Sequence, residues 1–158
     1  MKSKAFVFDF DDTLATTDAM VIVGEQEMTP QEYNAYILKD GEHFDFSQFK
    51  NPERIANAIP MELMSLAQTL QAEGHPLFIL TARNNCVSDA IAAFLETHGI
   101  TCKAVHCVGS DTANIAKEKR TVLLSIIENY DTVYFYDDDE KNVSLASEIS
   151  GIKAIKVD

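Results

Sequence analysis

The chain of 158 residues has the length of one domain, and its 46% hydrophobic and 24% charged residues are ordinary for a globular protein. Its charge is unusual, because 25 acidic residues outnumber 13 basic ones and leave a formal net charge of −12. Such a chain repels bulk nucleic acid and anionic membrane surfaces, which argues against a dedicated nucleic-acid-binding module.

No apolar run reaches the roughly 18 residues that a membrane-spanning helix needs. The basic start of the chain precedes only a short apolar segment, broken by Asp9, which is unlike a signal peptide. Cys86, Cys102 and Cys107 are an odd number and form no CxxC pair, so neither a disulfide framework nor a zinc site is expected. We expect reduced thiols, a cytoplasmic protein and no membrane partner.

Short strands and longer helical patterns alternate along most of the chain. In order, they are strand 5–10, helix 61–72, strand 76–81, helix 87–98, strand 103–108, a helix from a cap at Ser110 or Asp111 to about Tyr130, strand 132–136, helix 142–149 and strand 152–157. Most of the strands are continuously apolar, as in a parallel sheet that is buried on both faces. The alternation predicts a three-layer α/β domain of Rossmann-like type, with helices flanking a parallel sheet.

Residues 16–60 do not follow this alternation. They contain three of the four prolines and no clear strand, although a helix is expected to begin at Pro30. The aromatic residues within 44–49 make the segment too apolar for a disordered linker. We therefore expect a single domain over residues 1–158, with a small ordered insertion over residues 16–60 at one end of the sheet.

Polar side chains follow three of the predicted strands at their carboxyl ends. Asp9 and Asp11 end the first strand, Thr81 ends the second, and an acidic run that includes Asp137 and Asp138 ends the fourth. The carboxyl ends of parallel strands meet at one edge of a sheet, where ligands bind. Converging carboxylates repel one another unless a cation is present, and all-oxygen ligands favour Mg²⁺. Two separate, solvated acidic turns are the alternative interpretation.

These same segments resemble the motifs of a known superfamily. Residues 6–14, FVFDFDDTL, closely resemble the DxDxT motif of the haloacid dehalogenase (HAD) superfamily. Residues 78–83, FILTAR, resemble its second motif, and residues 135–142, FYDDDEKN, resemble its fourth motif in the DDxxxN form. The resemblance covers about residues 4–14 and 75–158. It implies a HAD-like fold in which the insertion is a small cap or lid.

The third motif of the superfamily is a lysine, and the chain offers Lys117 and Lys119. Lys119 lies four residues after Ile115 and three before Val122, so helical geometry places it on the apolar, inward face. Lys117 points to another side of the helix. The pattern therefore favours Lys119, with Lys117 as the alternative.

The resemblance also implies a role for each motif residue. Asp9 would be the nucleophile that forms an aspartyl-phosphate, and Asp11 the general acid and base. Thr81 would donate a hydrogen bond to the phosphoryl group, and Lys119 would offset negative charge. Because dehalogenases of the superfamily lack the second aspartate of the first motif, Asp11 implies phosphoryl transfer.

The same resemblance implies a Mg²⁺ site. Asp9, the backbone carbonyl of Asp11 and Asp138 would bind the ion. Asp137 and Asn142 would bind it through water or orient its ligands.

A small cap leaves the site open, so the expected substrate is a small phosphorylated metabolite such as a nucleotide or a sugar phosphate. Arg83 could bind its phosphate or carboxylate, or could be a surface arginine paired with an acid.

A polynucleotide-end phosphatase is the alternative within the superfamily. The acidic charge of the chain argues against a nucleic-acid partner. A cluster of Lys50, Arg54, Arg83 and Lys119 at the mouth of the site would favour such a partner. A phosphoacceptor domain like a response-regulator receiver places its acids in a different order, and a non-catalytic binding domain is the remaining alternative. The sequence gives no oligomeric state.

Overall fold

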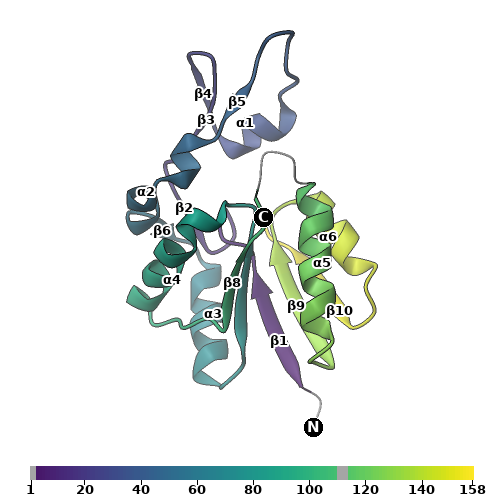
Figure 1. Cartoon of the computed structure of the whole chain (residues 1–158). Coiled ribbons are helices and arrows are strands. Elements are labelled where there is room, and N and C mark those ends of the chain that lie inside the picture. Colours follow the sequence, from purple (N-terminus) through teal and green to yellow (C-terminus); the bar gives the residue numbers. More distant parts are fainter. Residues whose placement is uncertain (1–2, 110–113) are drawn as a thin grey trace.

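A five-stranded parallel sheet forms the centre of the computed structural model, which describes residues 3–109 and 114–158 (Figure 1). The strand order is β10-β9-β1-β7-β8, and each neighbouring pair is parallel. The strands are Lys4–Phe8 (β1), Leu77–Thr81 (β7), Ala104–Cys107 (β8), Thr132–Asp137 (β9) and Ile152–Lys156 (β10). The predicted parallel sheet is confirmed.

Two pairs of helices cover the two faces of this sheet. They are α3 (Leu63–Ala72) with α4 (Ser88–Thr97), and α5 (Ile115–Ile127) with α6 (Glu140–Ser147). Phe6 and Phe8 of β1 pack in the core on the side of α3 and α4, whereas Ala5 and Val7 pack on the side of α5 and α6. This period of two buries β1 on both sides, and the predicted three-layer α/β fold is confirmed.

Residues 15–60, called the insertion below, lie beyond the carboxyl ends of the sheet strands (Figure 1). The segment leaves through β2 (Ala15–Thr16) and returns through β6 (Ile59–Pro60), and these two strands pair in antiparallel fashion. Between them lie β3 (Val21–Val23), β4 (Gln26–Met28), α1 (Pro30–Ala35), β5 (Phe44–Asp45), the 3-10 helix η1 (Ser47–Lys50) and α2 (Pro52–Ala56). The strands β4, β3 and β5 form a small antiparallel sheet with a core of its own.

The expectation that residues 16–60 hold no clear strand is wrong, because the structure has short strands there of two or three residues each. The helix predicted to begin at Pro30 is confirmed, with Thr29 as its cap. The cap expected at Ser110 or Asp111 lies outside the described residues. The long helix is described from Ile115, where the Asn114 side chain accepts a hydrogen bond from the Lys117 amide.

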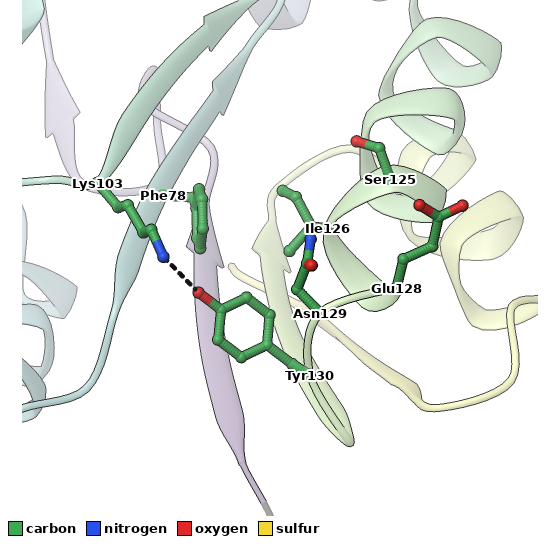
Figure 2. A pocket seen from close by; sticks show the side chains of 7 residues that line it. All are labelled: Phe78, Lys103, Ser125, Ile126, Glu128, Asn129 and Tyr130. Atoms are coloured by element: carbon green, nitrogen blue, oxygen red, sulfur yellow. Dashed lines mark hydrogen bonds between the residues drawn. The ribbon is translucent and has the colours of Figure 1, made fainter.

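A groove of about 610 Å³ lies between α5 and the β7–β8 side of the sheet (Figure 2). Phe78, Lys103 and Tyr130 line it, and the Lys103 Nζ donates a hydrogen bond to the Tyr130 hydroxyl at 3.2 Å. These residues lie near the amino ends of β7, β8 and β9, at the edge of the sheet opposite to the acidic strand ends. Among the described residues, no helix combines the length and hydropathy that crossing a membrane requires.

Candidate active site

Asp9 lies at the carboxyl end of the central strand β1 with 6% of its surface exposed. Its amide donates a hydrogen bond to the Tyr136 carbonyl at 2.9 Å, which fixes its backbone against β9. The chain then turns tightly, since the Phe10 carbonyl accepts from the amides of Thr13, Leu14 and Ala15. This turn returns the Thr13 hydroxyl to the Asp9 Oδ2, to which it donates at 3.2 Å.

Lys119, on α5, contacts the other oxygen of the Asp9 carboxylate. Its side chain is 2% exposed, and its Nζ lies 3.1 Å from the Asp9 Oδ1 and 2.7 Å from the Asp137 Oδ2. Burial alone would lower the pKa of this ammonium group, but the charges of Asp9 and Asp137 outweigh burial and raise the pKa above its ordinary value. Lys117 is exposed, so of the two candidate lysines only Lys119 lies at the site.

Asp137 is oriented by hydrogen bonds to both of its oxygens. Its Oδ2 accepts from Lys119 and from the Asn142 Nδ2, and its Oδ1 accepts from the Asp139 amide at 2.9 Å. Asn142 itself is 7% exposed. Asp139 caps α6, because its side chain accepts a hydrogen bond from the Lys141 amide at 2.8 Å. With these partners, Asp137 is suited to orienting neighbouring groups.

The carboxylates of Asp9, Asp137 and Asp138 converge, with one ligand oxygen from each within 4.8 Å of the others. Burial and then the charge of Asp137 raise the pKa of Asp9 well above its ordinary value, and Lys119 offsets this in part. Burial also raises the pKa of Asp138, whose carboxyl lies close to that of Asp9. Such a pair needs a shared proton or a cation between its oxygens.

These residues fit a divalent cation. The donors are all carboxylate oxygens, as hard cations require, and the repulsion that raises the pKa of Asp9 is what a cation would relieve. Asp9 and Asp138 belong to the predicted ligand set, and Asp137 stands beside them. The third predicted ligand, the Asp11 backbone carbonyl, stays a prediction.

Thr81 ends β7 with 1% of its surface exposed. Its hydroxyl oxygen accepts a hydrogen bond from the Arg83 amide at 3.1 Å. The hydroxyl hydrogen is therefore left to donate elsewhere.

Arg83 is neither at the surface nor free. Its guanidinium forms a bidentate ion pair with Asp11, with the Nε 2.8 Å from Oδ2 and the Nη2 2.7 Å from Oδ1. The arginine side chain is 2% exposed, against 24% for that of Asp11. The interpretation of Arg83 as a surface arginine paired with an acid is thus correct in the pairing, because Asp11 is the partner. It is wrong in the surface position, because the arginine side chain is buried.

Three of the four basic residues whose clustering would favour a nucleic-acid end are paired with acids. Arg54 pairs with Asp18 at 2.9 Å, Arg83 pairs with Asp11, and Lys119 is buried between carboxylates. Lys50 is exposed, and its charge adds to the hydrogen bonds from Ser47 that are the main cause of the lowered pKa of Asp45. No patch of unpaired cations results from these four residues.

The sequence analysis did not assign a role to three residues of the site. Thr13 holds Asp9, and it could have been found from its place in the DxDxT motif. Thr17 and Phe49 hold Arg83 from the insertion, and their sequence neighbourhoods carry no signal of this.

Neither a scan against protein-family models nor a search of curated proteins finds a match for the chain. Solved structures do match. A chain of the Pnkp1/Rnl/Hen1 RNA repair complex superposes with a TM-score of 0.69 at 16% identity, covering 99% of this chain and 42% of that one. A haloacid dehalogenase-like hydrolase of Streptococcus pneumoniae gives a TM-score of 0.60 at 14% identity and covers 98% and 84%. This chain has the HAD-like fold.

A third similar structure of this fold is the D,D-heptose 1,7-bisphosphate phosphatase of B. bronchiseptica, complexed with magnesium and phosphate. It has a TM-score of 0.56 and 12% identity, and covers 96% of this chain and 78% of that chain. The chain thus spans less than half of the RNA repair protein and most of the other two HAD-like proteins. The resemblance inferred from the motifs is confirmed for the fold.

Proposed function

We propose that the protein is a Mg²⁺-dependent phosphomonoesterase that works through an aspartyl-phosphate on Asp9. One observation carries this proposal. The Asp9 carboxylate ends the central strand between the Lys119 ammonium and the Thr13 hydroxyl, with Asp137 and Asp138 beside it. A nucleophilic carboxylate next to cation ligands and a buried lysine suits attack on a phosphate ester.

The reaction would proceed in two displacements. First, an Asp9 oxygen attacks phosphorus, a bond to phosphorus forms, the ester bond breaks, and Asp11 gives its proton to the departing alkoxide. Second, water attacks the aspartyl-phosphate while Asp11 takes a proton from it. The bond between Asp9 and phosphorus then breaks and inorganic phosphate leaves.

The other site residues would stabilise the charge that develops on the phosphoryl oxygens. Thr81 has a hydroxyl hydrogen to donate, and Lys119 supplies a fixed positive charge. Bound by Asp9, Asp138 and the Asp11 backbone carbonyl, Mg²⁺ would supply charge compensation and orient the phosphate. Asp137 and Asn142 would hold Lys119 and the neighbouring ligands in place.

A small phosphorylated metabolite, such as a nucleotide or a sugar phosphate, is the substrate that we propose, in a cytoplasmic setting. The pairing of Arg54, Arg83 and Lys119 with acids supports it, because nucleic-acid ends need unpaired cations. A polynucleotide-end phosphatase is the second candidate, favoured by the similarity to a chain of an RNA repair complex.

Phosphate release tests the proposal. Wild type should release phosphate from p-nitrophenyl phosphate with Mg²⁺ and lose this activity with EDTA. Asp9→Asn should abolish it while the far-UV circular dichroism stays unchanged, because an amide cannot form the covalent intermediate. Asp40→Asn, at an exposed position, is the matched control and should keep full activity. Appreciable turnover by Asp9→Asn would refute the covalent mechanism.

The substrate class is then read from a panel of nucleotides, sugar phosphates and oligonucleotides with a terminal phosphate. Preference for the small phosphates would support the first candidate. Preference for the oligonucleotides, falling steeply with added salt, would support the second.

A further inference from the structure

The sheet is less well covered at its β8 edge than at its centre. All five residues of β7 are buried, whereas the four residues of its neighbour β8 are only partly buried. The β8 sequence, AVHC, contains no acid, lysine or arginine. The groove of about 610 Å³ lies here, between these two strands and α5 (Figure 2). Its volume is within the range of about 300–1,000 Å³ that is usual for small-molecule sites.

Apolar side chains form the inner wall of the groove. Phe78 on β7 and Ile126 on α5 line it and are 7% and 5% exposed. The Tyr130 ring meets Phe78 edge to face, with the ring centroids 6.1 Å apart. The His106 ring packs beside Phe78 at 6.3 Å, and burial lowers the pKa of this histidine, so it adds no positive charge at neutral pH. These side chains offer an apolar surface to a ring or a short hydrocarbon chain.

Lys103 places a positive charge beside this surface. Its Nζ donates a hydrogen bond to the Tyr130 hydroxyl at 3.2 Å and lies 5.8 Å from the centroid of the Tyr130 ring (Figure 2). Within residues 3–109 and 114–158, Lys103 forms no ion pair, although the chain has 25 acidic residues against 13 basic ones. Two of the three ammonium donors remain, and the Tyr130 hydroxyl, which accepts from Lys103, still has its own hydrogen to donate. The two groups are thus neighbouring donors suited to an anion.

We infer that the groove binds a small monocarboxylate with an aromatic ring or a short hydrocarbon chain. A carboxylate has two oxygens side by side, so that one can accept from Lys103 and the other from Tyr130. The apolar body would lie against Phe78 and Ile126. Glu128 also lines the groove and would repel a second negative charge on the ligand. A singly charged acid therefore fits the groove better than a doubly charged phosphate.

The groove is separate from the candidate active site. Phe78 lies near the amino end of β7, whose carboxyl end is Thr81. Tyr130 follows the end of α5, whereas Lys119 lies near the start of this helix. A carboxylate in the groove would leave Asp9 accessible. Its binding needs neither substrate nor Mg²⁺ and can be measured on the intact chain.

Nuclear magnetic resonance of the isotope-labelled chain, titrated with benzoate, tests this binding. Saturable shifts are expected at the backbone amides of Asn129 and Tyr130, with a dissociation constant in roughly the millimolar range for so small a ligand. Benzamide has the same shape without the charge and should bind about tenfold or more weakly, because a hydrogen bond to a charged group is lost. Phthalate, with a second carboxylate, should also bind more weakly than benzoate.

Two substitutions separate the charges from the apolar surface. Lys103→Met should weaken benzoate binding about tenfold or more and change benzamide binding much less. Glu128→Gln should strengthen the binding of phthalate more than that of benzoate. Lys153→Met is the matched control, because the Lys153 Nζ lies 5.5 Å from the centroid of the Tyr134 ring and neither residue lines the groove. Its affinity for benzoate should equal that of wild type.

Absence of saturable shifts at Asn129 and Tyr130 with benzoate would overturn this assignment, as would shifts confined to the surroundings of Asp9. Equal benzoate affinities of Lys103→Met and Lys153→Met would show that the ammonium does not hold the carboxylate, and would overturn it too. None of these results depends on phosphate release, so the groove and the proposed function can fail separately.

Discussion

A buried lysine between two buried carboxylates is a costly arrangement that depends on the charge of the lysine. Removing ions from water costs several kcal/mol each, and only short, well-directed contacts offset this. Lys119 makes such contacts with Asp9 and Asp137 at 3.1 and 2.7 Å. The two carboxylates repel each other, so the ammonium stabilises both.

Lys119→Met is therefore expected to lower the free energy of unfolding by about 3–5 kcal/mol, the usual cost of leaving a buried charge without its partner. Turnover should be lost as well. Denaturant unfolding monitored by circular dichroism measures the first effect. Lys117→Met is the matched control, and since Lys117 is exposed on the same helix, its stability and turnover should stay close to wild type. Equal stability of the two variants would contradict the buried ion pair.

For single residues, the sequence predicted the positions that are set by local periodicity. It did not predict the contacts that depend on how the insertion packs against the rest of the chain. The spacing along α5 placed Lys119 on the buried face, and the strand ends placed Asp9, Asp137 and Thr81 at one edge. The contacts of Arg83 with Phe49 and Thr17 join segments far apart in the chain. No pattern within either segment determines that approach, so the burial of Arg83 could not be predicted.

At the scale of elements, the loops after β7 and β8 cross closely beside the site. A Cβ on Gly109 would lie 2.1 Å from the Ala82 carbonyl oxygen and 2.9 Å from the Arg83 carbonyl carbon. Both are backbone atoms, so they cannot move without moving the loop. Glycine at this position lets the Gly109 amide reach the Arg83 carbonyl.

Gly109→Ala should therefore displace the loop that carries Arg83. We expect a loss of about 1–3 kcal/mol of stability, as for overpacking elsewhere, together with a clear fall in turnover. Gly99→Ala is the control, because Gly99 has a φ of +78° and open space around it. It should lose about 1 kcal/mol through backbone strain alone and keep its kcat/KM. Thermal unfolding and phosphate release on both variants check this, and full activity in Gly109→Ala would contradict the close crossing.

The elements themselves were predictable where they are long and apolar. Each sheet strand lies within two residues of its predicted bounds at either end, because buried parallel strands read as continuous apolar runs. The strands of the insertion are two or three residues long, too short to show a period of two. Their pairing depends on the small core around Val21, Val23 and Met28.

At the scale of the whole molecule, three of the many acidic side chains converge where a cation would bind. In the metal-free protein, burial and Asp137 raise the pKa of Asp9 well above its ordinary value, and burial raises that of Asp138. An acid whose pKa is higher in the folded than in the unfolded state binds more protons when folded. Its contribution to stability is thus complete below its unfolded pKa and is lost as the pH rises through its folded pKa.

Mg²⁺ replaces the lost proton, so its stabilising effect should grow with pH. We expect the melting temperature with Mg²⁺ to exceed that with EDTA by more at pH 8 than at pH 5, since binding only to the folded state stabilises it.

Asp9→Asn removes the charge that burial and Asp137 disfavour. This variant should melt above wild type in EDTA at pH 8, with a much weaker response to Mg²⁺. Carboxyls with a lowered pKa, such as Asp45, make stability change with pH in the opposite direction. Their contribution is the same in wild type and in Asp9→Asn, so it cancels in the difference between the two proteins. Differential scanning calorimetry of both at each pH is the measurement. A wild type that melts higher in EDTA at pH 8 would show that the converging carboxylates of Asp9, Asp137 and Asp138 do not form a cation site.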